Sequence, residues 1–166
     1  MAWLREKRPI FAFVGKFGAL VILLYILLAL PGPEQFLYHY LQANAWLANL
    51  VLDLLGEGTR VHDVTVQSPD FAIRIQRGCD AIEPTWLLCA AILAFPASFP
   101  MKAMGMAAGI VVLQVLNVVR IITLYLIGRH LPAFFSPAHV EIWPVVFILV
   151  AIALFCAWKG WLSEKR

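Results

Sequence analysis

Four stretches of the chain are almost uninterrupted runs of apolar residues, each at or near the length that crosses a bilayer. A helix of about 20 consecutive apolar residues spans the hydrocarbon core. The runs cover about residues 10–30, 81–95, 103–127 and 140–158. The second is the shortest and borrows length from its flanks before Pro96 and Pro100 close a tight turn. The pattern predicts a mainly α-helical integral membrane bundle of about four transmembrane helices.

Residues 34–58 carry a mixed pattern, in which apolar residues recur at roughly helical spacing. Four polar residues interrupt them: His39, Gln42, Asn49 and Asp53. A membrane-crossing helix here would move the later segments to the opposite side and violate the balance of terminal charges. We therefore expect an amphipathic helix that lies on the outer surface of the membrane.

Residues 60–77 alternate between apolar and mostly polar positions on both sides of a Ser-Pro-Asp turn at 68–70. Such alternation around turn residues is typical of two paired strands. The alternating apolar residues are Val64, Val66, Phe71, Ile73 and Ile75. We expect a short outer β-hairpin that leads the chain to the second apolar run.

The composition is that of a membrane protein with one domain over residues 1–166. Hydrophobic residues make up 62% and charged residues 14% of the chain, and the mean hydropathy is +0.82. The net charge is only +3 without a basic stripe, which argues against a nucleic-acid partner. Three cysteines, two of them inside apolar runs, do not form a disulfide framework. We interpret the basic start of the chain as a retained anchor, not as a cleaved signal peptide.

Basic residues set the expected orientation, because cytoplasmic loops of membrane proteins carry an excess of Lys and Arg. They gather at the two ends of the chain and in the turn after the second run. The residues concerned are Arg5, Lys7, Arg8, Lys16, Lys102, Lys159, Lys165 and Arg166. We expect a multi-pass protein of the cytoplasmic (inner) membrane, with both termini in the cytoplasm and residues 34–77 outside.

Cys79, Arg120 and His139 then fall at the same, outer end of three different apolar runs. A thiol attacks a carbonyl, an imidazole moves the proton, and a guanidinium stabilises the negative charge that develops. A helix N-terminus next to Cys79 would favour its thiolate. The convergence predicts a catalytic site of Cys79, Arg120 and His139 for acyl transfer.

Each residue also has a plainer interpretation. A lone cysteine in a membrane helix is commonly a packing residue, as Cys89 and Cys156 are expected to be. In a purely structural role, Arg120 would extend its guanidinium to the lipid headgroups or pair with Glu83 or Glu141. On the same interpretation His139 would be a surface residue in an interfacial loop.

Other ligands and chemistries are open at the same face. A zinc site would use Cys79, His130 and His139, although these lack a close ligand pair such as CxxC. A non-catalytic membrane module would use Arg120 and His139 to bind an anionic lipid or a partner helix. A hydrolase or phosphotransferase acting on lipid phosphate would need more basic or metal-binding groups than this face offers.

Three segments around these residues resemble a known family. They are RGCDAIE at 77–83, NVVRI at 117–121 and FFSPAHVEIWP at 134–144. In this order and at this membrane depth they are similar to the Cys, Arg and His motifs of the exosortase and archaeosortase family, and most similar to its small H-type members. The resemblance extends from about Leu47 to Trp158. Ala81 departs from it, because family members commonly have Gly two residues after the Cys, although a helical turn at this position would tolerate Ala.

The resemblance implies a membrane cysteine transpeptidase or protease that needs no cofactor. Its substrates would be exported proteins with a short C-terminal motif, a transmembrane helix and a basic tail, and for H-type members the motif begins Ile-Pro-Thr-Leu. Cys79 would attack the scissile carbonyl, Arg120 would stabilise the oxyanion, and His139 would protonate the leaving amine. A thioester intermediate would then pass to an acceptor amine or to water.

Overall fold

The computed structural model describes residues 2–30 and 34–164. Its elements along the chain are α1 (Ala2–Ala29), α2 (Glu34–Leu54), β1 (Arg60–His62), β2 (Thr65–Gln67), β3 (Ala72–Arg74), α3 (Ile82–Ala94), α4 (Phe99–His130), η1 (Pro132–Phe134), α5 (Phe135–Pro137), η2 (Ala138–Ile142) and α6 (Trp143–Glu164). The expected helical membrane bundle is confirmed, with a small sheet attached to it.

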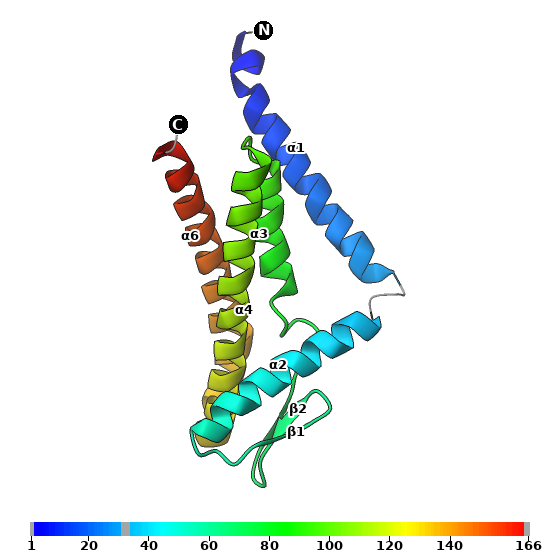
Figure 1. Ribbon diagram of the computed structural model, residues 1–166, viewed down its shortest axis with the longest axis vertical. Coiled ribbons are helices and arrows are strands. Elements are labelled where there is room, and N and C mark those ends of the chain that lie inside the picture. Colours follow the sequence, from blue (N-terminus) through cyan, green and yellow to red (C-terminus); the bar gives the residue numbers. More distant parts are fainter. Residues whose placement is uncertain (1, 31–33, 165–166) are drawn as a thin grey trace.

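Helices α3, α4 and α6 pack against one another, and α1 leans on α3 (Figure 1). Three described helical segments are long and apolar enough to cross a membrane: within α1, along α4, and from η1 through α6. The remaining predicted span is α3, which has 13 residues and is therefore only about 20 Å long. Although it is short, α3 lies at the centre of the bundle, because it packs against α1, α4 and α6.

Two glycines of α4 allow the three central helices to approach closely. A Cβ atom on Gly105 would lie 2.4 Å from Nε1 of Trp158 in α6, and one on Gly109 would lie 2.4 Å from a methyl carbon of Leu88 in α3. The small residues four apart on α4 thus receive the large side chains of both neighbours, as is common in membrane helix packing. The indole of Trp158 also donates a hydrogen bond to the Met101 carbonyl at 3.0 Å.

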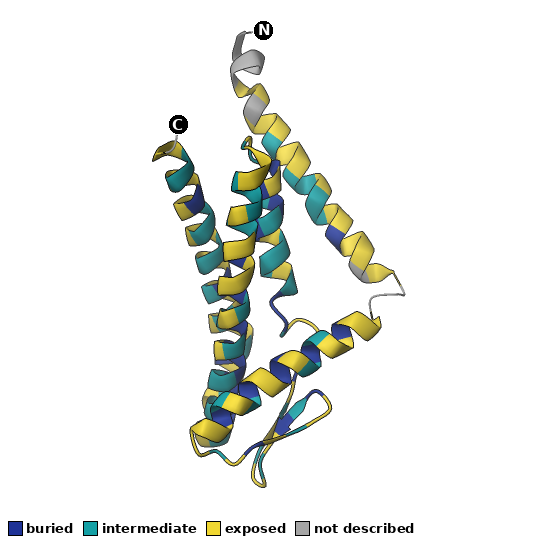
Figure 2. Ribbon diagram, in the orientation of Figure 1, coloured by how far each residue is buried: buried dark blue, intermediate teal, exposed yellow. Residues whose placement is uncertain are grey.

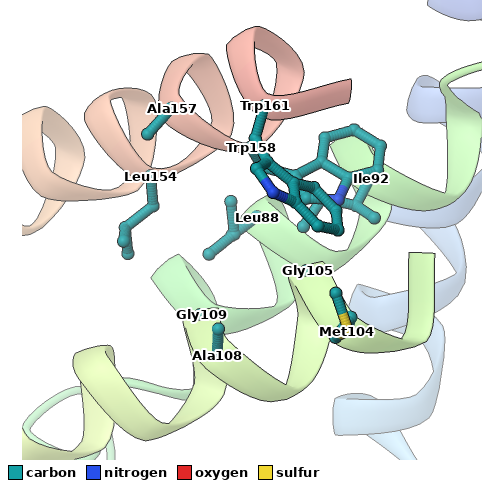
Figure 3. A pocket seen from close by; sticks show the side chains of 10 residues that line it. All are labelled: Leu88, Ile92, Met104, Gly105, Ala108, Gly109, Leu154, Ala157, Trp158 and Trp161. Atoms are coloured by element: carbon teal, nitrogen blue, oxygen red, sulfur yellow. The ribbon is translucent and has the colours of Figure 1, made fainter. Parts of the chain in front are cut away.

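An apolar cavity of about 310 Å³ lies beside this packing, between α3, α4 and α6 (Figure 3). Side chains of all three helices surround it, among them Ile92, Met104 and Leu154. Arg120 lies about 16 Å further along α4 than Gly109 on its lining, at 1.5 Å per residue. This cavity is therefore remote from the candidate chemistry.

Helix α2 crosses the opposite end of α4 and covers the sheet (Figure 1). It buries one face and exposes the other, as an amphipathic helix does (Figure 2). The buried face includes Leu41, Ala45, Ala48 and Leu52, which form a core with Tyr125 of α4 and with apolar residues of the sheet. Helix α2 is not among the described helices that are long and apolar enough to span a membrane, but its outer location stays a prediction.

The sheet has three antiparallel strands in the order β1-β2-β3. Its β2–β3 hairpin turns at residues 68–71, as predicted, and buries Val66 and Ile75. The sequence did not predict β1, which pairs with β2 through a tight turn where Asp63 takes the unusual φ of 62°. Asp tolerates this left-handed conformation better than most residues, and its carboxylate accepts a short hydrogen bond from the Tyr38 hydroxyl of α2.

Both ends of the described chain and the connection between α3 and α4 lie at one end of the bundle, and the sheet lies at the other (Figure 1). This arrangement agrees with the alternation expected of the apolar runs. Which end faces the cytoplasm stays a prediction. Lys165 and Arg166, which contributed to that prediction, lie outside the described residues.

Candidate active site

Cys79 lies in a turn between β3 and α3. Gly78, immediately before it, has φ of 87°, and the Cys79 amide donates to the Gln76 carbonyl at 2.9 Å. Helix α3 begins only at Ile82, whose amide donates to Oδ1 of Asp80 at 3.1 Å. Cys79 therefore lies before the first turn of α3. The effect of the helix dipole is strongest at that first turn.

Ala81 does not lie in a helical turn, so the expectation that this position readily tolerates Ala is wrong. It adopts a left-handed conformation with φ of 57° and ψ of 14°, directly before α3, and is buried. Glycine adopts this conformation without strain, whereas a Cβ atom costs roughly 1–2 kcal/mol. The backbone therefore explains why Gly suits the position two residues after the cysteine.

Arg120 reaches the cysteine turn from the interior of α4. Its side chain is buried, with the residue 5% exposed, and Nη1 donates to the Gly78 carbonyl at 3.3 Å. The guanidinium also lies over the Phe147 ring, 5.7 Å from its centroid, which is within cation–π range. Its Nε is buried without a hydrogen-bond partner among the described residues.

His139 reaches the same point from the segment before α6. That segment continues the helix from Pro132, but residues 138–142 form a single wider, π-helical turn. Such turns are rare and occur often at functional sites. The Phe135 ring stacks on the imidazole, with centroids 5.8 Å apart and an interplanar angle of 11°, and so fixes its plane.

The structure brings the three predicted side chains together. Sγ of Cys79 is 3.0 Å from Nε2 of His139 and 3.8 Å from Nη2 of Arg120. One cavity of about 380 Å³ contacts all three residues and is also lined by residues 72–77. A second cavity of about 220 Å³ reaches Arg120 from the other side, between α3 and α6. A thiol with an imidazole at hydrogen-bond distance is the arrangement of an activated cysteine nucleophile.

Burial raises the pKa of the Cys79 thiol, and the nearby Asp80 charge adds to this, whereas the Arg120 charge and the Gln76 hydrogen bond oppose it. This shift runs against the expected favouring of the thiolate by the helix N-terminus. A higher pKa favours the protonated thiol. A base must remove its proton, and Nε2 of His139 is in contact with Sγ.

The plainer interpretations of Arg120 do not fit its surroundings. A buried guanidinium does not snorkel, and among the described residues no ion pair joins Arg120 to Glu83 or Glu141. At this end of the bundle Arg129 pairs with Glu57 and Asp70, and His130 contacts Glu57.

The zinc interpretation also fails on position. His130 lies 3.3 Å from Glu57, away from Cys79 and His139. The described residues contain no group of three or more His, Cys, Asp and Glu side chains placed to hold a metal ion.

Sequence reasoning missed a polar cluster that supports the Cys79 turn. The Tyr40 hydroxyl of α2 lies 2.5 Å from both the Asp80 carbonyl and Oε1 of Gln114, and its one proton can be donated to either acceptor. Gln114 and Asn117 of α4 donate to Oδ1 of Asn44 at 2.6 and 3.1 Å. The available signal was the pair of amides inside an otherwise apolar span, because such groups need partners there.

These features define a class: an α-helical membrane protein with a cysteine, histidine and arginine gathered where three helices and a sheet meet. Residues 11–157 match the family model described as transmembrane exosortase (Exosortase_EpsH), and the chain belongs to this family. The family consists of membrane cysteine transpeptidases that act on exported proteins with C-terminal sorting signals. No curated protein and no solved structure matches the chain significantly.

Proposed function

We propose that this protein cleaves the C-terminal sorting signal of exported proteins through a thioester on Cys79. The observation that carries the proposal is the contact of Sγ with Nε2 of His139 at 3.0 Å, with Nη2 of Arg120 at 3.8 Å from the same sulfur. Family membership supports the reaction class, and the geometry supports these three residues as its catalytic groups.

The reaction begins when His139 takes the proton of the Cys79 thiol and the thiolate adds to the scissile carbonyl. Negative charge moves to the carbonyl oxygen, where Arg120 donates hydrogen bonds from Nη2 or from its unpartnered Nε. The intermediate collapses as the carbon–nitrogen bond breaks and His139 returns the proton to the leaving amine. The acyl group remains on Sγ until an acceptor amine or water attacks it.

The substrate chain would lie with its transmembrane helix beside the bundle and its motif at the outer end of the site. The second cavity, lined by Pro84, Leu87 and Ile148, offers an apolar path between α3 and α6 for the residues after the scissile bond. An Ile-Pro-Thr-Leu motif is the form that similarity to H-type members suggests. We assign the protein to the cytoplasmic membrane, with the site facing outward, on the distribution of its basic residues.

The test is co-expression with an exported protein that carries such a C-terminal signal, scored for processing. Cys79→Ala is expected to abolish processing. Cys89→Ala and Cys156→Ala are matched controls that should retain it, because neither cysteine touches His139 or Arg120. Full processing by a correctly inserted Cys79→Ala protein would remove Cys79 as the nucleophile.

A further inference from the structure

Strand β3 presents an unpaired edge to the candidate site. It is the last strand in the order β1-β2-β3, and no other described strand pairs with its outer side. Antiparallel pairs alternate between hydrogen-bonded and non-bonded positions. The Ser68 amide donates to the Phe71 carbonyl at 2.8 Å and the Ile75 amide to the Val64 carbonyl at 2.9 Å, which identifies two bonded pairs.

The register then fixes which main-chain groups are free. Val66 and Ile73 are partners midway between those two pairs, and so form a bonded pair as well. Ala72 and Arg74 are consequently the non-bonded positions, whose amide and carbonyl groups point away from β2. Both residues are exposed. The edge therefore offers donors and acceptors at alternate residues, spaced to pair with another extended chain.

This edge borders the cavity that contains the three candidate catalytic residues. All residues from Ala72 to Arg77 line the cavity of about 380 Å³, together with Cys79, Arg120 and His139. Phe135 also lines this cavity. A peptide that reaches Sγ through this space passes alongside the free groups of β3.

We propose that the substrate motif binds as an added strand on the outer edge of β3, through main-chain hydrogen bonds to Ala72 and Arg74. The proposal rests on the function proposed above and names how that site holds its substrate. Strand addition of this kind takes affinity from the backbone and specificity from pockets for alternate side chains. It suits an enzyme that must hold an extended segment next to a membrane helix.

The direction of the added strand follows from the course of β3. Phe71 packs on Tyr125 and Gly128 near the end of α4, whereas Cys79 lies beside Arg120. The chain from 71 to 79 thus runs from the sheet end toward the middle of the bundle. A substrate passes the same way, from its exported part to its transmembrane helix, and so pairs parallel to β3.

Arg74→Pro tests the edge directly, because proline removes the outward amide and places a ring there while leaving the bonds to β2 intact. Arg74→Gln is the matched control, which loses the same charge but keeps the amide. We expect kcat/KM for a signal peptide to be about tenfold or more lower in Arg74→Pro than in Arg74→Gln, because only proline removes the main-chain donor. Alkylation of Cys79 by a small reagent should be equal in both.

Near-parental processing by Arg74→Pro overturns strand addition, and so does an equal loss in both variants, which would indicate a side-chain contact. If Arg74→Pro does not fold, the same question is tested with the parent protein and substrate peptides that carry a single N-methyl group at successive residues. Sensitivity at alternate substrate residues supports the added strand, and uniform or absent sensitivity contradicts it. Failure of the proposed function looks different, since Cys79→Ala would then process substrate.

The direction is tested by disulfide trapping. Ala72→Cys is combined with alanine at positions 79, 89 and 156, and the substrate peptide carries one cysteine either before or after the scissile bond. Parallel pairing predicts trapping only with the cysteine before the bond. Trapping with the cysteine after the bond overturns the parallel arrangement.

Discussion

Replacing Arg120 by lysine separates a catalytic guanidinium from a structural cation. The parent side chain makes two directed contacts in the cysteine turn, from Nη1 to the Gly78 carbonyl and from Nη2 to Sγ of Cys79, and keeps Nε free. A lysine retains the charge over the Phe147 ring but has one ammonium in place of a planar fork. The single ammonium can contact the Gly78 carbonyl or Sγ of Cys79, but not both at once.

The expected loss of reaction rate in Arg120→Lys follows from the number of hydrogen-bond donors that lysine lacks. If the ammonium keeps the Gly78 carbonyl satisfied, the developing oxyanion loses a well-placed donor. Removal of one such donor slows the reaction by about 100-fold to 1,000-fold, or roughly 3–4 kcal/mol of transition-state stabilisation. Folding should change little, because charge and cation–π contact are retained.

The assay is single-turnover cleavage of a signal peptide by purified protein in lipid nanodiscs, with thermal unfolding measured alongside. We expect Arg120→Lys to insert, unfold near the parental temperature and still bind substrate, while its rate falls by the factor above. A rate near that of the parent, together with loss of Arg120→Ala from the membrane, would show that Arg120 is an anchor. The catalytic assignment would then reduce to Cys79 and His139.

Three further results are expected. Tyr40→Phe removes the hydroxyl that contacts the buried Asp80 carbonyl and Gln114. It should therefore lower the free energy of unfolding by about 1–3 kcal/mol and slow processing. Unchanged unfolding and an unchanged rate would refute the positioning role of Tyr40. Ala81→Gly removes left-handed strain of roughly 1–2 kcal/mol, against an unfolded-state cost of about 0.4–1 kcal/mol and the loss of a buried methyl group worth about 0.8 kcal/mol. The free energy of unfolding should therefore change by less than about 1 kcal/mol, and a larger loss in thermal unfolding would contradict the backbone argument. Burial raises the pKa of Cys79. In a protein without Cys89 and Cys156, the alkylation rate of Cys79 should therefore rise with pH around a midpoint above the ordinary thiol pKa of about 8.5. A midpoint at or below that value would refute the desolvated thiol.

The helical part of this fold was predictable because membrane helices leave a strong signal, a long apolar run. Helix α4 contains the expected span of 103–127 and extends it at both ends. The short β3–α3 region was harder, since Ala81 takes a backbone conformation that its residue type does not announce. Strand β1 was missed for a similar reason, because it has three residues and depends on the strained turn at Asp63.

The candidate site was predictable in its members but not in its details. Complementary groups at matching ends of separate spans indicated that Cys79, Arg120 and His139 would meet. Two features depend on tertiary structure and lay beyond the sequence. One is the π-helical turn that carries His139, and the other is the desolvation that raises the pKa of the Cys79 thiol. The Tyr40 contact with the Asp80 carbonyl joins residues 40 positions apart, which local patterns do not register.

The most direct measurement is the mass of the protein after brief reaction with a signal peptide and an acid quench. The account predicts an acyl adduct on Cys79 with the mass of the peptide part before the scissile bond, released by hydroxylamine as a thioester should be. It should be absent from Cys79→Ala and present in Cys89→Ala. Turnover without any adduct on Cys79, or an adduct on another residue that supports turnover, would contradict the central claim.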